Sequence, residues 1–230
     1  MSDTFQLLPR QPREGAKDYA FRVLKYNIVR LHLPPGTMIN ATELSEAAGV
    51  SRTPFREAMQ ELAKSGILHI FPQSGSQVSF IDYERIHQVR FIRLSLETAA
   101  ALEACEIIDP MRCLDFEEIL YQQEKSLKQN NLDALFEHDD RFHQTLFRVV
   151  GKDYAYEMME GVLIHFDRVR RLGAGAVPRQ RLIDDHRDIF EAISRREKPV
   201  VMDLMHRHLS RYREEEQSIR ETFPQYFEIV

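Results

Sequence analysis

One short stretch of this chain, Gly49 to Gly66, carries signals for both ends of a helix. Ser51 or Thr53 can cap its N-terminus, and Pro54 suits the first turn, where its missing N–H costs nothing. Gly66 is typical of a helix end because glycine adopts the left-handed conformation there. The sequence therefore predicts a short helix whose two ends are both set locally.

The two faces of this helix differ in character. At about 100° per residue, its apolar side chains gather on one side and its polar side chains on the other. The apolar side consists of Phe55, Ala58, Met59 and Leu62. The polar side consists of Thr53, Arg56, Glu57, Gln60 and Lys64, with Arg52 at its edge. We expect the first side to pack in a core and the second to contact a partner.

The neighbouring segments complete a small module. Residues 42–48 predict a short helix that Thr42 caps, and the turn Gly49-Val50 joins it to the next helix at helix-turn-helix spacing. An amphipathic helix is expected over 17–31, before a Pro-Pro-Gly break. Residues 67–71 and 77–81 predict a hairpin, which directly after the second helix would form a wing.

Residues 16–81 resemble the winged helix-turn-helix domain of the GntR family of bacterial transcription regulators. The matching residues are Leu33 to Ile39, Glu43 to Ser45, Gly49 to Ala58, Leu62, Gly66 and Gly75. The resemblance implies that Arg52, Thr53 and Arg56 contact a double-stranded DNA operator together with the wing tip at Gly75. Arginine suits this role because its planar fork binds guanine edges or phosphate. For an isolated helix, a solvated face would be the better interpretation, but the flanking helix and hairpin favour DNA binding.

Two further residues belong to the predicted DNA-binding surface. Ser51 stands at the helix start, where backbone N–H groups can face a phosphate. Thr42 stands where some relatives have an arginine, so whatever that arginine contacts is either lost here or supplied by another residue. Residues 1–15 predict a flexible arm. Its Arg10 and Arg13 either form part of a free tail, which is the simpler interpretation, or reach DNA.

Charge divides the 230 residues into unlike halves. Residues 1–80 contain nine Lys or Arg and seven Asp or Glu, a net charge of +2. Because the whole chain has a net charge of −5, residues 81–230 have a net charge of −7. A balance of +2 is weak for DNA binding by one copy, so we expect a homodimer on two half-sites.

No apolar run approaches a membrane span and the N-terminus lacks signal-peptide order, so a cytoplasmic location is expected. Cys105 and Cys113 predict free thiols.

Residues 82–230 predict an all-helical bundle, which makes the whole chain mainly α. No strand signal or phosphate-binding glycine loop occurs there, and Pro, Gly and Asn-Asn breaks separate amphipathic stretches. The expected helices are 83–107, 110–129, 131–150, 153–172, 179–196 and 198–222.

Four polar residues interrupt the apolar stripes of this bundle. Asp139 and His143 lie four apart in the third helix, His186 lies in the fifth, and His208 lies in the last. A buried imidazole or carboxylate is costly unless it is bonded, so four of them facing inward favour a shared divalent metal ion. These donors suit zinc, nickel, manganese or iron, and we expect zinc or nickel. For any one of these histidines alone, a core residue bonded to a backbone carbonyl would be the better interpretation.

This half resembles the FCD ligand-binding domain of the FadR-type subgroup of the GntR family. The matching motifs are Arg93 to Glu97, Asp139 to His143, His186 and His208. The resemblance implies that Asp139, His143, His186 and His208 are the metal ligands. Arg93 and Arg141 are candidates to bind an anionic effector, with structural salt bridges as the equal alternative. His165, near an apolar stripe of the fourth helix, could line the same cavity.

These features predict a ligand-responsive transcription regulator rather than an enzyme. As a homodimer, it would bind a pseudo-palindromic operator, and a small organic acid would complete the metal shell and change the DNA affinity. The alternative is a metal-dependent hydrolase with an attached DNA-binding domain, since such a metal site can activate water. A bundle that binds a larger ligand, such as an acyl thioester, without metal is a third interpretation.

Overall fold

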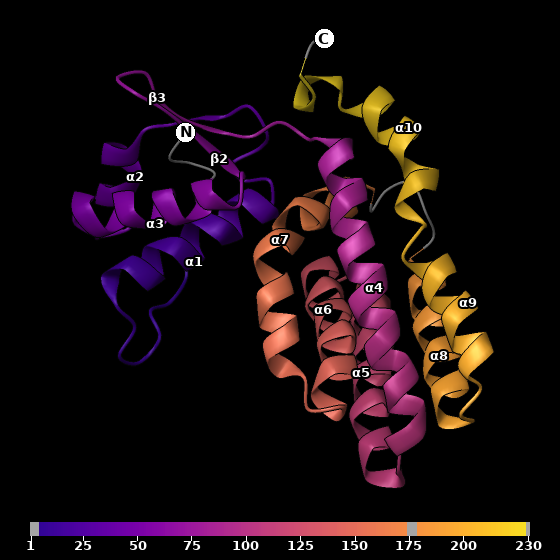
Figure 1. Ribbon diagram of the computed structural model, residues 1–230. Helices are drawn as coiled ribbons and strands as arrows, with labels where there is room; N and C mark the ends of the chain where they lie inside the picture. Colours follow the sequence, from indigo (N-terminus) through magenta and orange to yellow (C-terminus); the bar gives the residue numbers. More distant parts are fainter. Residues whose placement is uncertain (1–4, 174–178, 229–230) are drawn as a thin grey trace. The chain divides into compact units, whose positions relative to one another are not determined.

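The computed structural model describes residues 5–173 and 179–228, most of which are helical (Figure 1). The chain forms two compact units. The first comprises Met1–Ile86, Gly161–Leu172 and Ser218–Val230, and the second comprises His87–Glu160 and Gly173–Gln217. No helix in the described ranges is long and apolar enough to cross a membrane.

The first unit contains the predicted helix-turn-helix and wing. Its elements are α1 (Ala16–Val29), β1 (Met38–Ile39), α2 (Ala41–Ala47), α3 (Arg52–Lys64), β2 (Leu68–Phe71) and β3 (Gly75–Val78). The strands form one antiparallel sheet in the order β1-β3-β2. β1 is a strand of only two residues, too short to leave a period-two pattern, and the sequence did not predict it.

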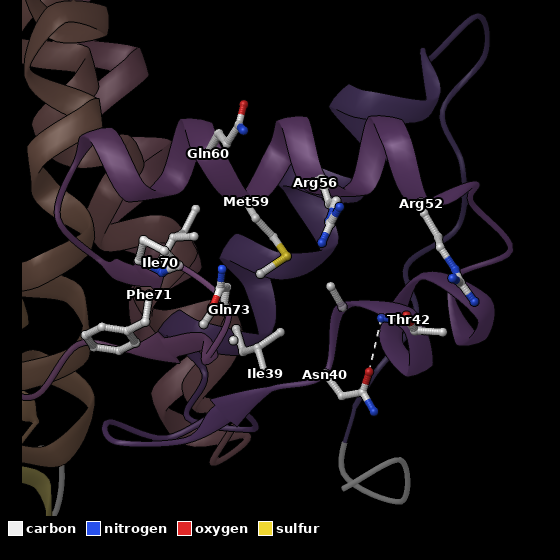
Figure 2. Close-up of a pocket in the computed structure, with 14 residues that line it drawn as sticks. Ile39, Asn40, Thr42, Arg52, Arg56, Met59, Gln60, Ile70, Phe71 and Gln73 are labelled. Atoms are coloured by element: carbon white, nitrogen blue, oxygen red, sulfur yellow. Dashed lines mark hydrogen bonds between the residues drawn. The ribbon is translucent and has the colours of Figure 1, made fainter.

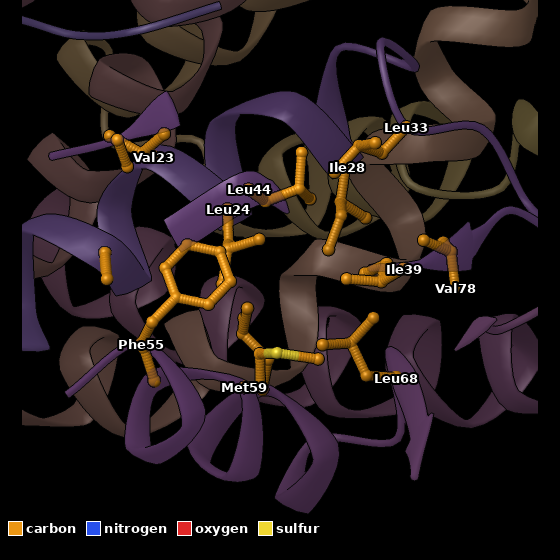
Figure 3. Close-up of a cluster of buried hydrophobic side chains, with 14 of the residues drawn as sticks. Val23, Leu24, Ile28, Leu33, Ile39, Leu44, Phe55, Met59, Leu68 and Val78 are labelled. Atoms are coloured by element: carbon orange, nitrogen blue, oxygen red, sulfur yellow. The ribbon is translucent and has the colours of Figure 1, made fainter. Parts of the chain in front are cut away.

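One apolar core holds these elements together. Val23, Leu24 and Ile28 of α1 meet Phe55 and Met59 of α3, and side chains of α2 and the sheet close the cluster (Figure 3). Each buried side chain of this size contributes roughly 1.5–3 kcal/mol of hydrophobic stabilisation. The core thus uses the face of α3 that the sequence assigned to packing and leaves its polar face outside.

The start of α2 corrects one sequence prediction. Asn40, not Thr42, caps this helix: its side-chain Oδ1 accepts hydrogen bonds from the backbone N–H groups of Thr42 at 3.1 Å and Glu43 at 3.2 Å. Asparagine is among the strongest N-cap residues, so the cap lies two residues before the predicted one and the helix begins at Ala41. Ser51 does occupy the N-cap position of α3, but without a side-chain capping bond.

The N-terminal arm also differs from its prediction. Phe5 is buried, and the fully buried Asn27 of α1 pairs with the backbone of Gln6, donating to its carbonyl and accepting from its N–H, both at 2.8 Å. One aromatic side chain and one buried amide therefore anchor the start of this segment on the first unit, contacts that the sequence did not predict. Residues 1–4 lie outside the described residues.

The second unit is a helical bundle. The helices that build it, wholly or in part, are α4 (Tyr83–Ile107), α5 (Pro110–Lys128), α6 (Leu132–Val149), α7 (Asp153–Leu172), α8 (Gln180–Ser194), α9 (Lys198–His208) and α10 (Tyr212–Thr222). A 3₁₀ turn, η2 (Pro224–Tyr226), follows in the first unit. Within the bundle, α5 packs on α6 and α8, and α8 packs on α9. Local caps fix several starts, such as Asp109 before Pro110 and Asn131 at α6.

The last predicted helix, 198–222, is in fact two. α9 ends at His208 and α10 begins at Tyr212. Arg90 of α4 donates to the Leu209 carbonyl at 3.3 Å and to the Ser210 hydroxyl at 2.6 Å. The first of these bonds satisfies a carbonyl at the end of α9, so a tertiary contact stabilises the break. No glycine or proline marks it in the sequence.

Candidate DNA-binding surface and metal centre

A groove runs along the exposed face of α3. Arg52, Arg56, Met59 and Gln60 line one side of this space of about 700 Å³ (Figure 2). The other side is formed by wing residues, including Ile70, Phe71, Gln73 and Gly75, and by the start of α2 at Asn40 and Thr42. The helix-turn-helix and the wing therefore present one continuous concave surface.

The predicted DNA-binding residues lie on this surface or at its edge. Ser51, Arg52, Thr53 and Arg56 are exposed at the N-terminal half of α3. The Arg52 side chain is 68% exposed, and its ion pair with Glu46 is long at 3.6 Å. An exposed ion pair of this kind contributes about 0–1 kcal/mol of stabilisation, so Arg52 can exchange it for a contact with another partner.

Gly75 begins β3 at the hairpin end with a φ of +99°. A residue with a Cβ is strained at that angle, so glycine keeps the wing backbone in this turn. At this position the wing therefore presents backbone to the groove, next to the side chains of Phe71 and Gln73.

The second unit brings the inward histidines together. His143 of α6, His186 of α8 and His208 of α9 are buried, and one ring nitrogen from each lies within 4.8 Å of the others. The Nε2 of His208 is 3.3 Å from the Nε2 of both His143 and His186. Asp139, one turn before His143, places Oδ1 3.5 Å from the Nε2 of His186. The convergence predicted from the sequence is present.

Each imidazole uses its other nitrogen, Nδ1, to contact a different buried side chain. The pairs are His143 with Glu97 at 2.7 Å, His186 with Gln123 at 2.9 Å and His208 with Asp185 at 3.2 Å. A carboxylate only accepts hydrogen bonds, so Glu97 and Asp185 place the ring proton on Nδ1. The amide of Gln123 can do the same by presenting its oxygen, which lies 3.1 Å away.

This arrangement fits a metal ion. With the protons on Nδ1, three Nε2 lone pairs point toward one centre beside a carboxylate oxygen, and no proton is left to bond them to one another. A cation relieves that repulsion, and imidazole nitrogen with carboxylate oxygen is a donor set that zinc and nickel accept. Outer partners that orient metal-binding histidines in this way are general in metal sites.

Burial and charge keep these groups in the required protonation states. Burial lowers the pKa of His208, which favours the neutral imidazole despite its bond to Asp185. Burial alone would raise the pKa of Glu97, but the charge of Arg93 and hydrogen bonds from His143 and Arg93 outweigh it and hold that pKa at about 2. Glu97 is therefore ionised at neutral pH.

The candidate effector residues do not gather at the histidine cluster. Arg93 is buried and donates from Nε to Glu97 at 2.6 Å, so it reaches the cluster through that carboxylate. Arg141 is exposed on α6, off the face that carries Asp139 and His143. His165 belongs to the first unit, where its Nε2 lies 2.6 Å from the Ser65 carbonyl.

Sequence reasoning missed the roles of the three outer partners. Gln123 had a usable signal: it extends the buried apolar stripe of Phe116, Ile119 and Leu120 on α5. Asp185 had a weaker signal in the sequence: it stands four residues before Ile189, which belongs to the apolar face of α8. Glu97 was noticed only as part of a motif, without its bond to His143.

Comparison with known proteins now adds to this geometry. Residues 17–78 match the family described as "Bacterial regulatory proteins, gntR family", and residues 88–211 match the "FCD domain". The chain is also 34% identical over 223 residues to the HTH-type transcriptional repressor RspR of Escherichia coli strain K12, covering 96% of both chains. This chain belongs to the GntR family and carries an FCD domain.

Other GntR relatives agree. The gluconate operon transcriptional repressor of Bacillus subtilis is 26% identical over 193 residues, covering 80% of this chain and 78% of the relative. Among solved structures, E. coli McbR/YncC matches with a TM-score of 0.74 and 18% identity over 93% of this chain and 99% of the other, which shows a shared fold. These families and relatives are transcription regulators, which sets aside the metal-dependent hydrolase.

Proposed function

We propose that this GntR-family regulator binds a pseudo-palindromic DNA operator as a homodimer and that a small carboxylic acid, bound at a metal centre in its helical unit, changes its DNA affinity. The α3 groove supports the first part, because Arg52, Arg56 and the Gly75 wing line one concave surface. The convergence of the Nε2 atoms of His143, His186 and His208 supports the second part and carries the proposal.

Asp139, His143, His186 and His208 would hold a divalent ion, zinc or nickel by preference. When bound, the ion would supply a Lewis acid to which a carboxylate oxygen can attach. The protein's share is to fix the donors: Glu97, Gln123 and Asp185 orient the three rings, and Phe142 stacks on His186 with centroids 3.9 Å apart.

The buried charges of the site favour an anionic effector. Glu97 is paired with Arg93, and Asp185 is paired with Arg211, so these two outer carboxylates are already neutralised. Asp139 alone would offset one of the two positive charges of a divalent ion. The remaining single positive charge suits a carboxylate, and a buried charge without a counter-charge is costly.

A ligand bound at this point would act on several helices at once. Its donors come from α6, α8 and α9, so a ligand that binds only when these helices are correctly spaced shifts the bundle toward that arrangement. We propose that this shift lowers DNA affinity and releases the operator.

An apolar surface of the helical unit supports the homodimer. Leu94, Thr98 and Leu102 of α4 and Met202 of α9 line a shallow hollow of about 320 Å³. Phe91, one turn earlier on α4, is 70% exposed. We propose that a second copy of the chain covers this surface, since contiguous exposed apolar patches often mark interfaces.

The relatives named as repressors support repression rather than activation, and we propose that the protein acts in the cytoplasm, where the bacterial chromosome lies.

A thermal-shift screen of carboxylic acids against the zinc-loaded protein, with and without a chelator, tests the proposed binding of an acid at the metal centre. We expect an acid that raises the melting temperature only when metal is present. Stabilisation that survives the chelator would contradict the metal-bound effector.

A further inference from the structure

The N-terminal segment 5–15 is a built element of the first unit. Beyond the contacts of Phe5 and Asn27, the Tyr19 hydroxyl donates to the Leu8 carbonyl at 3.0 Å. Arg22 donates to the Pro9 carbonyl at 2.8 Å. These bonds tie the segment to α1 along most of its length, so its side chains have defined positions.

Arg10 lies at the turn of the helix-turn-helix. Its Nη2 donates to the Gly49 carbonyl at 3.2 Å, and its guanidinium lies 4.7 Å from the centroid of the Tyr19 ring. Gly49 is two residues before Ser51, the N-cap position of α3. The charge of Arg10 is therefore held beside the N-terminal end of α3, the end that also carries Arg52.

Arg13 is exposed in a turn that is closed by hydrogen bonds. The Gln11 N–H donates to the Glu14 carboxylate at 3.0 Å, the Glu14 N–H donates to the Gln11 carbonyl at 3.1 Å, and Arg22 binds the same carboxylate through two nitrogens at 2.7 Å. Arg13 has a φ of +65° in this turn. A non-glycine residue pays about 1 kcal/mol for that conformation, and such strain is often kept where a side chain has a task.

Neither arginine is neutralised by an ion pair. No carboxylate in the described chain lies within 4 Å of Arg10 or Arg13, whereas Glu14 is used by Arg22 and Glu61 by Lys17. Arg10 donates to a neutral carbonyl, lies over the Tyr19 ring and remains exposed. Arg10 thus adds a positive charge beside the N-terminal end of α3, and Arg13 adds an exposed one three residues later in the same segment.

We propose that Arg10 and Arg13 form a second contact with DNA, in which each binds a backbone phosphate that flanks the bases facing α3. The segment would then supply positive charge that the first unit, with a small net charge, otherwise lacks. This inference rests on the proposed DNA binding by α3.

The test measures the salt dependence of binding to a labelled mixed-sequence duplex of about 30 base pairs, which reports phosphate contacts without a known operator. Each phosphate contact contributes about 0.9 to the slope of log K against log salt. Arg13→Gln should lower the slope of the homodimer by about 2, and the Arg10→Gln, Arg13→Gln double variant by about 4. Arg13→Lys should restore most of the loss.

Two comparisons separate this inference from the proposed function. Arg195→Gln, on the exposed end of α8, makes the same change in net charge and should leave the slope unchanged, while Arg56→Gln should lower it. Slopes of the Arg13 and double variants equal to wild type, with Arg56→Gln still reduced, would overturn the inference alone. No binding by wild type at low salt would overturn the proposed function as well.

Discussion

Replacing Asp185 with asparagine isolates the work of one outer partner of the histidine cluster. The Asp185 carboxylate accepts from His208 Nδ1 at 3.2 Å, and its side chain is almost fully buried. Hydrogen bonds to a charged acceptor contribute about 1.5–3 kcal/mol, and those to a neutral one about 0.5–1.5 kcal/mol. Asp185→Asn should therefore reduce the stabilisation of the oriented His208 ring by roughly 1–1.5 kcal/mol. We expect about a tenfold weaker metal affinity.

The adjacent residue provides a matched control. Asp184 stands on the same helix, but its side chain is 53% exposed and contacts only the surface residues Gln180 and Arg187. Asp184→Asn makes the same chemical change and should leave metal affinity within twofold of wild type.

The assay titrates metal-free protein with zinc in competition with a chromogenic chelator. Melting temperatures of both variants in excess chelator correct for any loss of folding, because Asp185 also binds Arg211. A zinc affinity of Asp185→Asn equal to that of wild type would refute the argument that the outer carboxylate orients His208. Equal weakening by the two variants would refute it too, since general surface charge would then be the cause.

Other consequences can be measured separately. Arg52→Ala or Arg56→Ala should weaken operator binding about fivefold to a hundredfold without changing the melting temperature, as followed by fluorescence anisotropy. His143→Ala should abolish zinc uptake, as measured by elemental analysis of the purified protein. Burial lowers the pKa of His165 to about 4, so in excess chelator about 3 kcal/mol of stability, fully present above pH 6.5, should disappear as the pH falls toward 4. In urea unfolding, His165→Gln should remove that part of the pH dependence. Phe91→Glu should convert the homodimer to monomers in analytical ultracentrifugation.

The fold was largely accessible from the sequence because its signals are local. Caps, breaks and helical periodicity gave α4 and α7 to the residue, and they gave the other helices of the bundle to within two residues except at the end. The break after His208 escaped because Arg90, far away in the chain, stabilises it. The contacts of residues 5–9 with α1 escaped for the same reason, since they depend on Asn27, Tyr19 and Arg22, more than ten residues away in the chain.

The candidate site divides in the same way. Inward histidines were visible because each interrupts an apolar stripe on its own helix. Their outer partners were not, since a pair such as Gln123 and His186 comes from two helices whose register relative to each other no periodicity records. Arg93 shows the converse problem: its motif was visible, but its commitment to Glu97 needed coordinates.

The three side chains that contact the Nδ1 atoms of the histidine cluster, Glu97, Asp185 and Gln123, differ in how many other groups they bind. Glu97 and Asp185 each bind an arginine as well as an imidazole, so changing either disturbs two contacts at once. Gln123 carries no charge, and either end of its amide faces His186. Selection, or a protein engineer, could thus retune the proposed metal site at position 123 while disturbing fewer contacts than a change of Glu97 or Asp185 would.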